Sequence, residues 1–323
     1  VKLVRLLTEY KNAHALLISE TNVPNRENLT YFGNSNEAHI IYNFSLPPLV
    51  IHALLAGDCS YLKSWMMSMP PSPVGCTYLN FTASHDGIGL RPAEGLLSDG
   101  ELQQMLGTLE SFGGRISTRT DAEGNEKPYE ANIALFDAFK GTYNGTDKWQ
   151  VERLICSQTI MLAVEGIPAF YIHTLFATPN DEDKLEATGH NRSINRRNWS
   201  LSDLQARIDE PGGPGQRVFD ELRRLIRLRS HQPAFHPNAT QFTLHIRPEI
   251  FAFWRQSIRR TQSIFCIYNL SYQPQEISLS DLNLISTETW FDLISDQPIT
   301  DLYGKITLSP YQALWLTNYN EPL

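Results

Sequence analysis

Short apolar runs alternate with amphipathic helical patterns over the first 235 residues of the sequence. The runs are continuously hydrophobic, as strands are when helices cover both faces of a parallel sheet. They fall at residues 16–19, 39–44, 78–83 and 169–175. One helix between two runs opens at Pro47-Pro48 and continues with apolar residues at core spacing. This alternation predicts an α/β fold with a parallel sheet whose strands end in polar loops.

The pattern changes near residue 240. From there, strand-like segments follow one another with no helical pattern between them. They cover residues 251–254, 263–269, 287–292 and 306–317. We therefore expect an α/β domain over residues 1–235 and a small antiparallel β domain over residues 236–323.

A (β/α)8 TIM-type barrel is the architecture that the alternation favours for the first domain. Such a barrel needs eight strand–helix units, whereas residues 1–235 hold only four. The sequence thus predicts half of a barrel followed by the antiparallel domain. Because half a barrel leaves two open strand edges, we expect it to depend on a partner.

Composition excludes several classes of protein. The 27 Lys and Arg residues against 35 Asp and Glu give a net charge of −8, so the chain lacks the positive field that nucleic acids and anionic membranes attract. No apolar stretch offers the roughly 20 uninterrupted residues of a membrane span. The four cysteines form no C-x-x-C pair, which favours reduced thiols and a cytoplasmic location. No spacing of His residues is that of a metal site, and the acidic run at 181–183 is better explained as a solvated loop than as a calcium site.

Two acidic residues stand at the ends of predicted strands. Glu20 follows the run at 16–19, and Asp86 follows the run at 78–83 after two residues. Barrel enzymes carry catalytic groups at the carboxyl ends of their strands. A partly desolvated carboxyl group there can keep its proton and protonate a leaving oxygen, which is the chemistry of glycoside cleavage. The same positions suit an acid that merely caps the following helix, so placement alone leaves both interpretations open.

Four segments carry a resemblance to a known family. They are ISETNVPNRENLTYFG at 18–33, FTASHDGIGLRP at 81–92, GIPAFYIHTLFATPND at 166–181 and RSINR at 192–196. Together and in this order they resemble the retaining glycoside-active enzymes of the α-amylase superfamily, most closely the sucrose-phosphorylase-like subfamily. The resemblance extends over essentially the whole chain, including the terminal β domain.

The resemblance implies a role for each matching residue. Glu20 would be the general acid/base. His85 and Asp86 would bind sugar hydroxyls, and Arg192 would contact the glucosyl unit. The family's nucleophile is an aspartate in a G-x-R-x-D motif on the fourth barrel strand, and no such motif precedes Glu20. The resemblance therefore places this chain at barrel strands five to eight plus the β domain, and it predicts that the chain needs the N-terminal half of the barrel and is inactive alone.

The activity that the resemblance implies is a double displacement, in which Glu20 first protonates the departing oxygen and then acts as a base. With phosphate as the co-substrate, a small α-glucoside gives α-glucose 1-phosphate, and no other cofactor is expected. With water the product is glucose, so an α-glucoside hydrolase is the alternative to a glycoside phosphorylase. A non-catalytic remnant or sugar-binding module is the alternative from another class.

The identity of the acceptor depends on residues 113–132, which we expect to form a polar, irregular loop that faces the substrate. Within it, Tyr129 and Glu130 stand where sucrose phosphorylases carry a Tyr-Gln pair. A carboxylate here would repel phosphate or an anionic acceptor unless an arginine offsets it. Besides Arg192, the candidate arginines are Arg91, Arg115 and Arg119. The motifs resemble those of glucosylglycerate and sucrose 6-phosphate phosphorylases, so glycerate is the first expectation, ahead of fructose, fructose 6-phosphate and glycerol.

Overall fold

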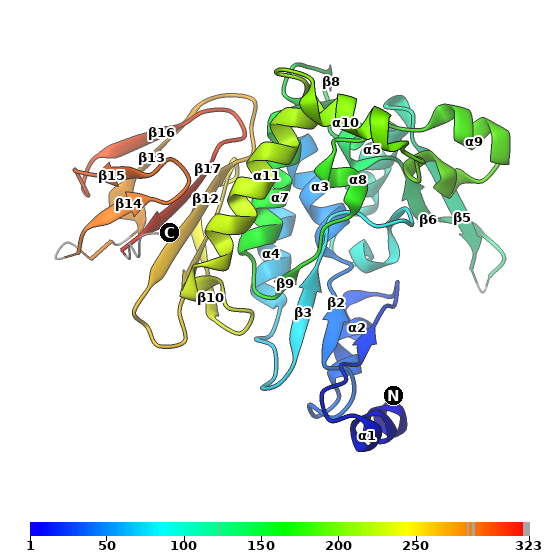
Figure 1. Cartoon of the computed structure of the whole chain (residues 1–323), viewed down its shortest axis with the longest axis horizontal. Helices are drawn as coiled ribbons and strands as arrows, with labels where there is room; N and C mark the ends of the chain where they lie inside the picture. Colours follow the sequence, from blue (N-terminus) through cyan, green and yellow to red (C-terminus); the bar gives the residue numbers. More distant parts are fainter. Residues whose placement is uncertain (122, 283, 286–287, 319–323) are drawn as a thin grey trace.

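A parallel sheet of four strands lies at the centre of the molecule (Figure 1). The computed structural model describes residues 1–121, 123–282, 284–285 and 288–318. The strands of the sheet are β1 (Ile18–Ser19), β2 (Ile40–Tyr42), β3 (Thr77–Asn80) and β9 (Ile167–Pro168), in that spatial order. All neighbours run parallel, so the carboxyl ends of the four strands meet at one edge of the sheet. The parallel sheet expected from the apolar runs is therefore present.

Helices cover this sheet with their apolar sides. α3 (Leu46–Ala56) is apolar all round and is buried along almost its whole length. α7 (Gln150–Ala163) is buried in the same way and packs against α11 (Pro214–Ser230). α11 buries a stripe of residues spaced three or four apart, as an amphipathic helix on the surface does. Its arginines are exposed except Arg229, which is partly buried and donates to the Leu162 carbonyl of α7 at 2.7 Å. Further helices are α2 (Asn25–Leu29), α4 (Ser60–Ser68), α5 (Asp99–Ser111), α6 (Leu135–Ala138), α9 (Glu182–Thr188) and α10 (Leu201–Asp209).

The fourth strand is shorter and earlier than predicted. The apolar run at 169–175 was expected to be a strand, but β9 ends at Pro168 and the run continues into the helix α8 (Ile172–Leu175). The Ala169 amide still donates to the Asn80 carbonyl at 2.7 Å, after which the chain turns away from the sheet. A short apolar run does not distinguish a buried strand from a buried helix, which is why the prediction was wrong here.

The segment at 113–132 is also more regular than expected. It forms a hairpin of β5 (Arg115–Thr120) and β6 (Glu126–Asn132), to which β4 (Ile88–Gly89) adds a third antiparallel strand. Exposed and half-buried residues alternate along β5 except at Ile116 and Ser117, which are both half-buried where the pairing with β6 shifts register, so much of the hairpin is solvated. The expectation of an irregular loop was wrong, because polar residues in this segment form two paired strands. β6 carries Glu130 and Asn132 next to the loop that follows β3.

A six-stranded antiparallel sheet follows in the chain, on the left of Figure 1. Its spatial order is β10 (Thr240–Arg247), β11 (Ile250–Gln256), β12 (Ser263–Asn269), β17 (Ala313–Thr317), β14 (Trp290–Asp292) and β15 (Gln297–Ile299). The run at 306–317 was predicted as one strand and is two, because a turn with Tyr311 at φ 58° separates β16 (Lys305–Leu308) from β17. β16 pairs with β13 (Gln275–Ser278) instead. Residue 287, the start of another predicted strand, lies outside the described residues.

The antiparallel sheet packs directly on α7. Tyr268 on β12 donates its hydroxyl to the Thr159 carbonyl of α7 at 3.2 Å. The fully buried Arg255 on β11 donates to the Ala163 carbonyl at the end of the same helix, at 2.5 Å. Apolar residues of α7, α11 and the sheet belong to a single continuous core. The two parts of the chain are thus joined by buried apolar and polar contacts.

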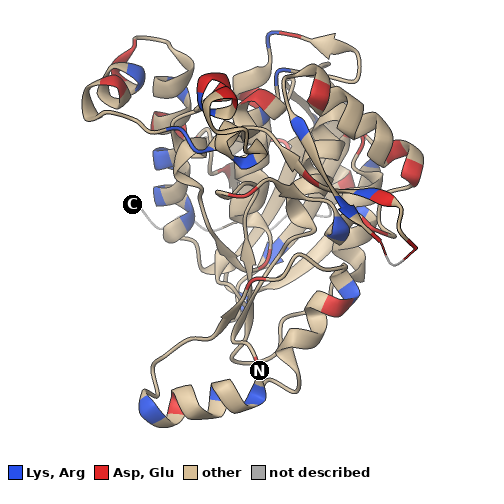
Figure 2. Cartoon of the chain, turned by 90° about the vertical axis from the view of Figure 1, so that its right-hand side faces the viewer, with Lys and Arg blue, Asp and Glu red and all other residues tan. Residues whose placement is uncertain are grey.

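The helix α1 (Lys2–Lys11) lies at the foot of Figures 1 and 2. Its polar side contacts the segment before β2, since Arg5 donates to the Glu37 carbonyl at 3.0 Å and Glu9 lies 3.3 Å from His39 Nε2. None of its residues is buried, although it is amphipathic. Its exposed hydrophobic side chains are Leu3, Val4, Leu6, Leu7 and Tyr10. Figure 2 also shows acidic and basic residues interspersed over the visible face of the molecule. Among the described residues, no helix combines the length and the apolar character needed to cross a bilayer.

Candidate active site

The loop that follows β3 carries Asp86, and two arginines bind the carboxylate of this residue. Arg192 donates from Nη1 to Asp86 Oδ1 at 2.7 Å, and Arg196 donates from Nη2 to the same oxygen at 2.9 Å. Both arginines come from the 3₁₀ segment around residues 191–196, which lies beside β6. Within the described part of the chain, no side chain or backbone group binds the second oxygen, Oδ2. The Asp86 side chain is 30% exposed, and its second oxygen can accept hydrogen bonds from hydroxyl groups.

Glu130 holds the other side of Arg192. The Glu130 carboxylate accepts from Arg192 Nε at 3.0 Å on Oε1 and from Nη2 at 2.7 Å on Oε2. This two-point geometry fixes the plane of the guanidinium group. Hydrogen bonding to Glu130 raises the pKa of Arg192, with the negative charges of Glu130 and Asp86 acting in the same direction. Two carboxylates and two guanidinium groups therefore form a cluster whose formal charges balance.

A glycine makes room for this buried acid. Glu130 is 3% exposed, and its Oε1 also accepts the backbone N–H of Gly87 at 2.7 Å. A Cβ atom at position 87 would lie 2.5 Å from Glu130 Cγ, closer than real carbon atoms approach. Gly87 and Glu130 are thus sterically matched.

His85 is next to Asp86 in sequence and near its carboxylate but makes no hydrogen bond to it. The His85 side chain is 63% exposed, and its Nε2 lies 3.6 Å from Asp86 Oδ1, beyond hydrogen-bond distance. Its backbone carbonyl, in contrast, accepts from Arg196 Nε at 2.5 Å. The structure therefore leaves the imidazole free to contact a ligand over the same loop.

Glu20 ends β1 at the same edge of the sheet. Its side chain is exposed. The pKa of the nearby Tyr42 is raised, first by the burial of the tyrosine itself and then by the negative charge of Glu20. The loop after Glu20 reaches the segment after Asp86, since a Cβ atom at Gly89 would lie 2.8 Å from Asn22 Oδ1. The loops that carry the two predicted catalytic acids thus touch one another.

An aromatic cluster lies where β2 and β3 end. The rings of Tyr42 and Phe44 are 5.6 Å apart, and Phe81 packs edge-on against both, at 5.4 and 5.1 Å. Sequence reasoning did not single out these rings. Their signal was available, because all three lie within the apolar runs at 39–44 and 78–83. They give the carboxyl edge of the sheet an apolar patch beside its charged groups.

The remaining predicted residues take different positions. Tyr129 precedes Glu130 on β6 and accepts the Leu90 N–H at 3.0 Å through its backbone carbonyl. Arg91 is half-buried, and its Nε has no hydrogen-bond partner among the described residues. Arg115 binds carbonyls of its own turn and Arg119 pairs with Glu94, so neither reaches Glu130.

Two residues of this site were not among the candidates. Arg196 shares Asp86 with Arg192, and the Asn195 amide donates to the backbone carbonyls of Ser84 and Asp86 at 3.1 and 2.8 Å. Both belong to the RSINR segment, whose first residue alone was singled out. The spacing of the two arginines, four positions apart, was the available signal.

Comparison with known proteins shows which enzymes share this architecture. The family model described as Maltogenic Amylase, C-terminal domain, matches residues 241–315. The solved sucrose 6F-phosphate phosphorylase from Thermoanaerobacter thermosaccharolyticum superposes with a TM-score of 0.68 at 19% identity, over 83% of this chain and 50% of that chain. An α-amylase from Geobacillus thermoleovorans gives a TM-score of 0.63 at 11% identity, over 99% and 57%. The fold is therefore that of the α-amylase-type TIM-barrel enzymes with their C-terminal β domain.

The relatives found by sequence define the family more narrowly than the structural matches do. A glucosylglycerate phosphorylase from Allomeiothermus silvanus is 36% identical over 98% of this chain and 54% of its own length. One from Escherichia coli is 32% identical over 98% and 55%. The chain thus spans about half the length of the curated relatives that it matches. The resemblance drawn from the motifs is confirmed, and the chain is a homologue of the glucosylglycerate and sucrose phosphorylases of the α-amylase superfamily.

Proposed function

We propose that this chain is the acid/base-bearing part of a glycoside phosphorylase. The complete enzyme would move a glucosyl group from an α-glucoside, glucosylglycerate first, to phosphate and release α-glucose 1-phosphate. The observation that carries this proposal is the carboxylate of Asp86, fixed by two arginines on one oxygen and open on the other. It is supported by relatives named as glucosylglycerate phosphorylases, at 36%, 34% and 32% identity.

In this mechanism Glu20 gives its proton to the glycosidic oxygen as the bond from that oxygen to the anomeric carbon breaks. A carboxylate from outside this chain forms the new bond to the anomeric carbon. A phosphate oxygen then displaces that carboxylate, and Glu20 takes the phosphate proton. The free oxygen of Asp86 and the imidazole of His85 would bind sugar hydroxyls more strongly as the ring gains positive charge.

The charge of Glu130 is compatible with an anionic acceptor. Arg192 neutralises it through two hydrogen bonds, which is the compensation that phosphate or glycerate would require. Tyr129 and Arg91 lie on the strands and turns around this pair and would complete the acceptor side of the site. Arg192 would act both as the partner of Glu130 and as a contact to the glucosyl unit.

The parallel sheet is proposed to be strands five to eight of the barrel. Within the described residues β1 and β9 each have one unpaired edge, and α1 shows a bare apolar side. The partner that would cover them is the N-terminal half of the barrel, which would also supply the nucleophile. We propose residues 1–235 as the barrel part and 236–323 as the β domain.

The proposal also includes a cytoplasmic location and a reaction without cofactors other than phosphate. Four buried free thiols, at Cys59, Cys76, Cys156 and Cys266, fit a reducing cytoplasm. The reaction needs no cofactor beyond phosphate, because the described carboxylates and arginines supply the proton transfer and charge stabilisation.

The test is a comparison of the chain alone with the chain joined to the N-terminal half of the Escherichia coli relative. Each is given glucosylglycerate and phosphate, and glucose 1-phosphate is measured. We expect product only from the joined protein, with a loss of about 10²–10⁴-fold in the Glu20→Gln variant. Glucose release that does not depend on phosphate would favour the hydrolase. Sugar binding without turnover in the joined protein would favour the non-catalytic module.

A further inference from the structure

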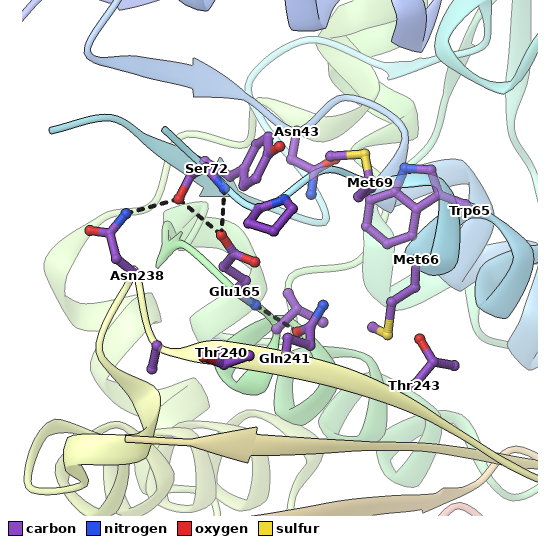
Figure 3. A pocket seen from close by; sticks show the side chains of 14 residues that line it. Asn43, Trp65, Met66, Met69, Ser72, Glu165, Asn238, Thr240, Gln241 and Thr243 are labelled. Atoms are coloured by element: carbon purple, nitrogen blue, oxygen red, sulfur yellow. Dashed lines mark hydrogen bonds between the residues drawn. The ribbon is translucent and has the colours of Figure 1, made fainter. Parts of the chain in front are cut away.

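A cavity lies beside the parallel sheet, away from the Asp86 cluster. It is enclosed between α4, the segment that leads into β3, the residues before β9 and the first strand of the antiparallel sheet, β10 (Figure 3). Its volume is about 190 Å³, and none of the residues that line it belongs to the site described above.

Two buried polar atoms in its wall have no partner. Trp65 is 3% exposed and Asn43 is 4% exposed, and both line the cavity. Within the described residues, Trp65 Nε1 and Asn43 Oδ1 make no hydrogen bond. One is a donor and the other an acceptor. Because buried polar groups are nearly always hydrogen-bonded, this pair points to a ligand or to ordered water in the cavity.

The opposite wall is polar and held in place. Glu165 Oε1 accepts from the backbone N–H and the hydroxyl of Ser72, both at 2.9 Å (Figure 3). Asn238 donates to the Ser72 hydroxyl at 2.8 Å, and Gln241 accepts the Glu165 N–H at 2.9 Å. These bonds fix the wall and leave Glu165 Oε2 and the Gln241 amide nitrogen without a hydrogen-bond partner within the described part of the chain. The wall thus offers both donors and acceptors.

The lining selects the chemistry of the occupant. Of the residues that the structure describes, those lining the cavity include the Glu165 carboxylate and no Lys, Arg or His, so the lining disfavours phosphate and carboxylates. An ammonium group has only donors and would leave the Trp65 donor unpaired. A hydroxyl group donates and accepts, and so it matches both orphan atoms. Met66, Met69 and Val164 add apolar surface suited to the C–H face of a sugar.

Size restricts the occupant further. A volume of about 190 Å³ is below the roughly 300 Å³ at which pockets for drug-sized ligands begin. It exceeds the volume of a single water several-fold, since water occupies about 30 Å³ in the liquid. We propose that this cavity is a second binding site for one neutral polyol, a monosaccharide or a three-carbon polyol, separate from the site of the reaction.

The test uses glycerol and glucose as neutral probes and glycerate as the anionic one. Saturation-transfer NMR and calorimetry on the 323-residue chain measure binding, and crystals soaked in each probe locate it. Thr243→Phe fills the cavity from an existing strand position, and Trp65→Phe removes the orphan donor but keeps an aromatic ring. His245→Phe adds the same ring to β10 at an exposed position that does not line the cavity.

We expect a neutral probe to bind with millimolar affinity in the original chain and in His245→Phe. Thr243→Phe should weaken this binding about tenfold or more, and Trp65→Phe should weaken it in the same direction. Glycerate should not compete. Cavity density that contains only waters after soaking, or polyol binding that Thr243→Phe leaves unchanged, would overturn the proposal.

Discussion

Glu130 and Arg192 form a two-point ion pair, with the guanidinium nitrogens 3.0 and 2.7 Å from the two carboxylate oxygens. The pair connects β6 to the 3₁₀ segment that precedes Arg196. With its plane fixed by Glu130, Arg192 has Nη1 left to reach Asp86. The orientation of the Asp86 carboxylate therefore depends on an acid that itself faces away from solvent.

Replacing Glu130 with Gln should loosen this pair. Arg192 would keep one neutral acceptor and lose the opposite charge, so the free energy of unfolding should fall by about 1–3 kcal/mol. Urea denaturation measures this change in the free energy of unfolding. The matched control is Glu94→Gln, which breaks the exposed pair with Arg119 and should cost less than about 1 kcal/mol. Equal costs for the two variants would show that burial of Glu130 does not strengthen its pair.

Adding a methyl group at position 87 should displace Glu130. The new Cβ would lie 2.5 Å from Glu130 Cγ, so Gly87→Ala should destabilise the chain by about 1–3 kcal/mol through overpacking. Gly107→Ala is the control, because that glycine lies inside α5 with no neighbour near its Cβ position. It should stabilise by about 0.5–1 kcal/mol. Thermal unfolding of both variants tests the opposite signs.

Removing Arg255 should destabilise the junction between α7 and the antiparallel sheet. This fully buried guanidinium donates to the carbonyls of Ala163 and His236, and burial lowers its pKa to about 10. Arg255→Met leaves the Ala163 carbonyl without its donor, whereas the His236 carbonyl keeps the Ala239 N–H, and we expect a loss of about 2–5 kcal/mol. Arg259→Met, on an exposed turn, should change stability by less than about 0.5 kcal/mol. Denaturant midpoints of the two variants give the comparison.

His173 should make stability depend on pH. Burial first, and then the charges of Lys184 and Arg197, lower the pKa of His173 below its ordinary value of 6.5. The unfolded chain therefore binds a proton before the folded chain does, and stability falls as the pH drops from about 6.5 through the folded pKa. His173→Gln should flatten this slope in urea midpoints taken between about pH 5 and pH 8. The exposed His245→Gln should leave it unchanged; a slope that persists in His173→Gln would contradict the assignment.

The sequence predicted those parts of the fold that depend on local apolar patterns. The parallel strands near residues 18, 40 and 78 and the helix that begins with Leu46 repeat that pattern directly. The hairpin at 115–132 was not predicted because its strands are polar. They are stabilised by pairing with each other and with β4, and such pairing leaves no apolar pattern in the sequence. β9 ends at Pro168 because the chain then turns, and the Tyr171 hydroxyl donates to the Asn195 carbonyl. No local sequence pattern predicts this contact between distant segments.

The candidate site was predictable one residue at a time but not as a network. Glu20, Asp86 and Arg192 follow from strand ends and from the motifs. The pairing of Arg192 with Glu130 depends on β6 crossing beside a segment 62 positions further along the chain. Contacts between groups so distant in sequence are set by tertiary packing. For the same reason Arg196 was missed, although it stands in the quoted motif.

The contact between Gly87 and Glu130 also has a consequence for evolution. A lineage that exchanges the acid for a shorter residue removes one obstacle at position 87, but the backbone carbonyl of Ala131 would still lie 2.7 Å from a Cβ atom there. Glycine should therefore be retained at position 87 whether or not residue 130 changes, so that selection acts more strictly on the glycine than on its partner.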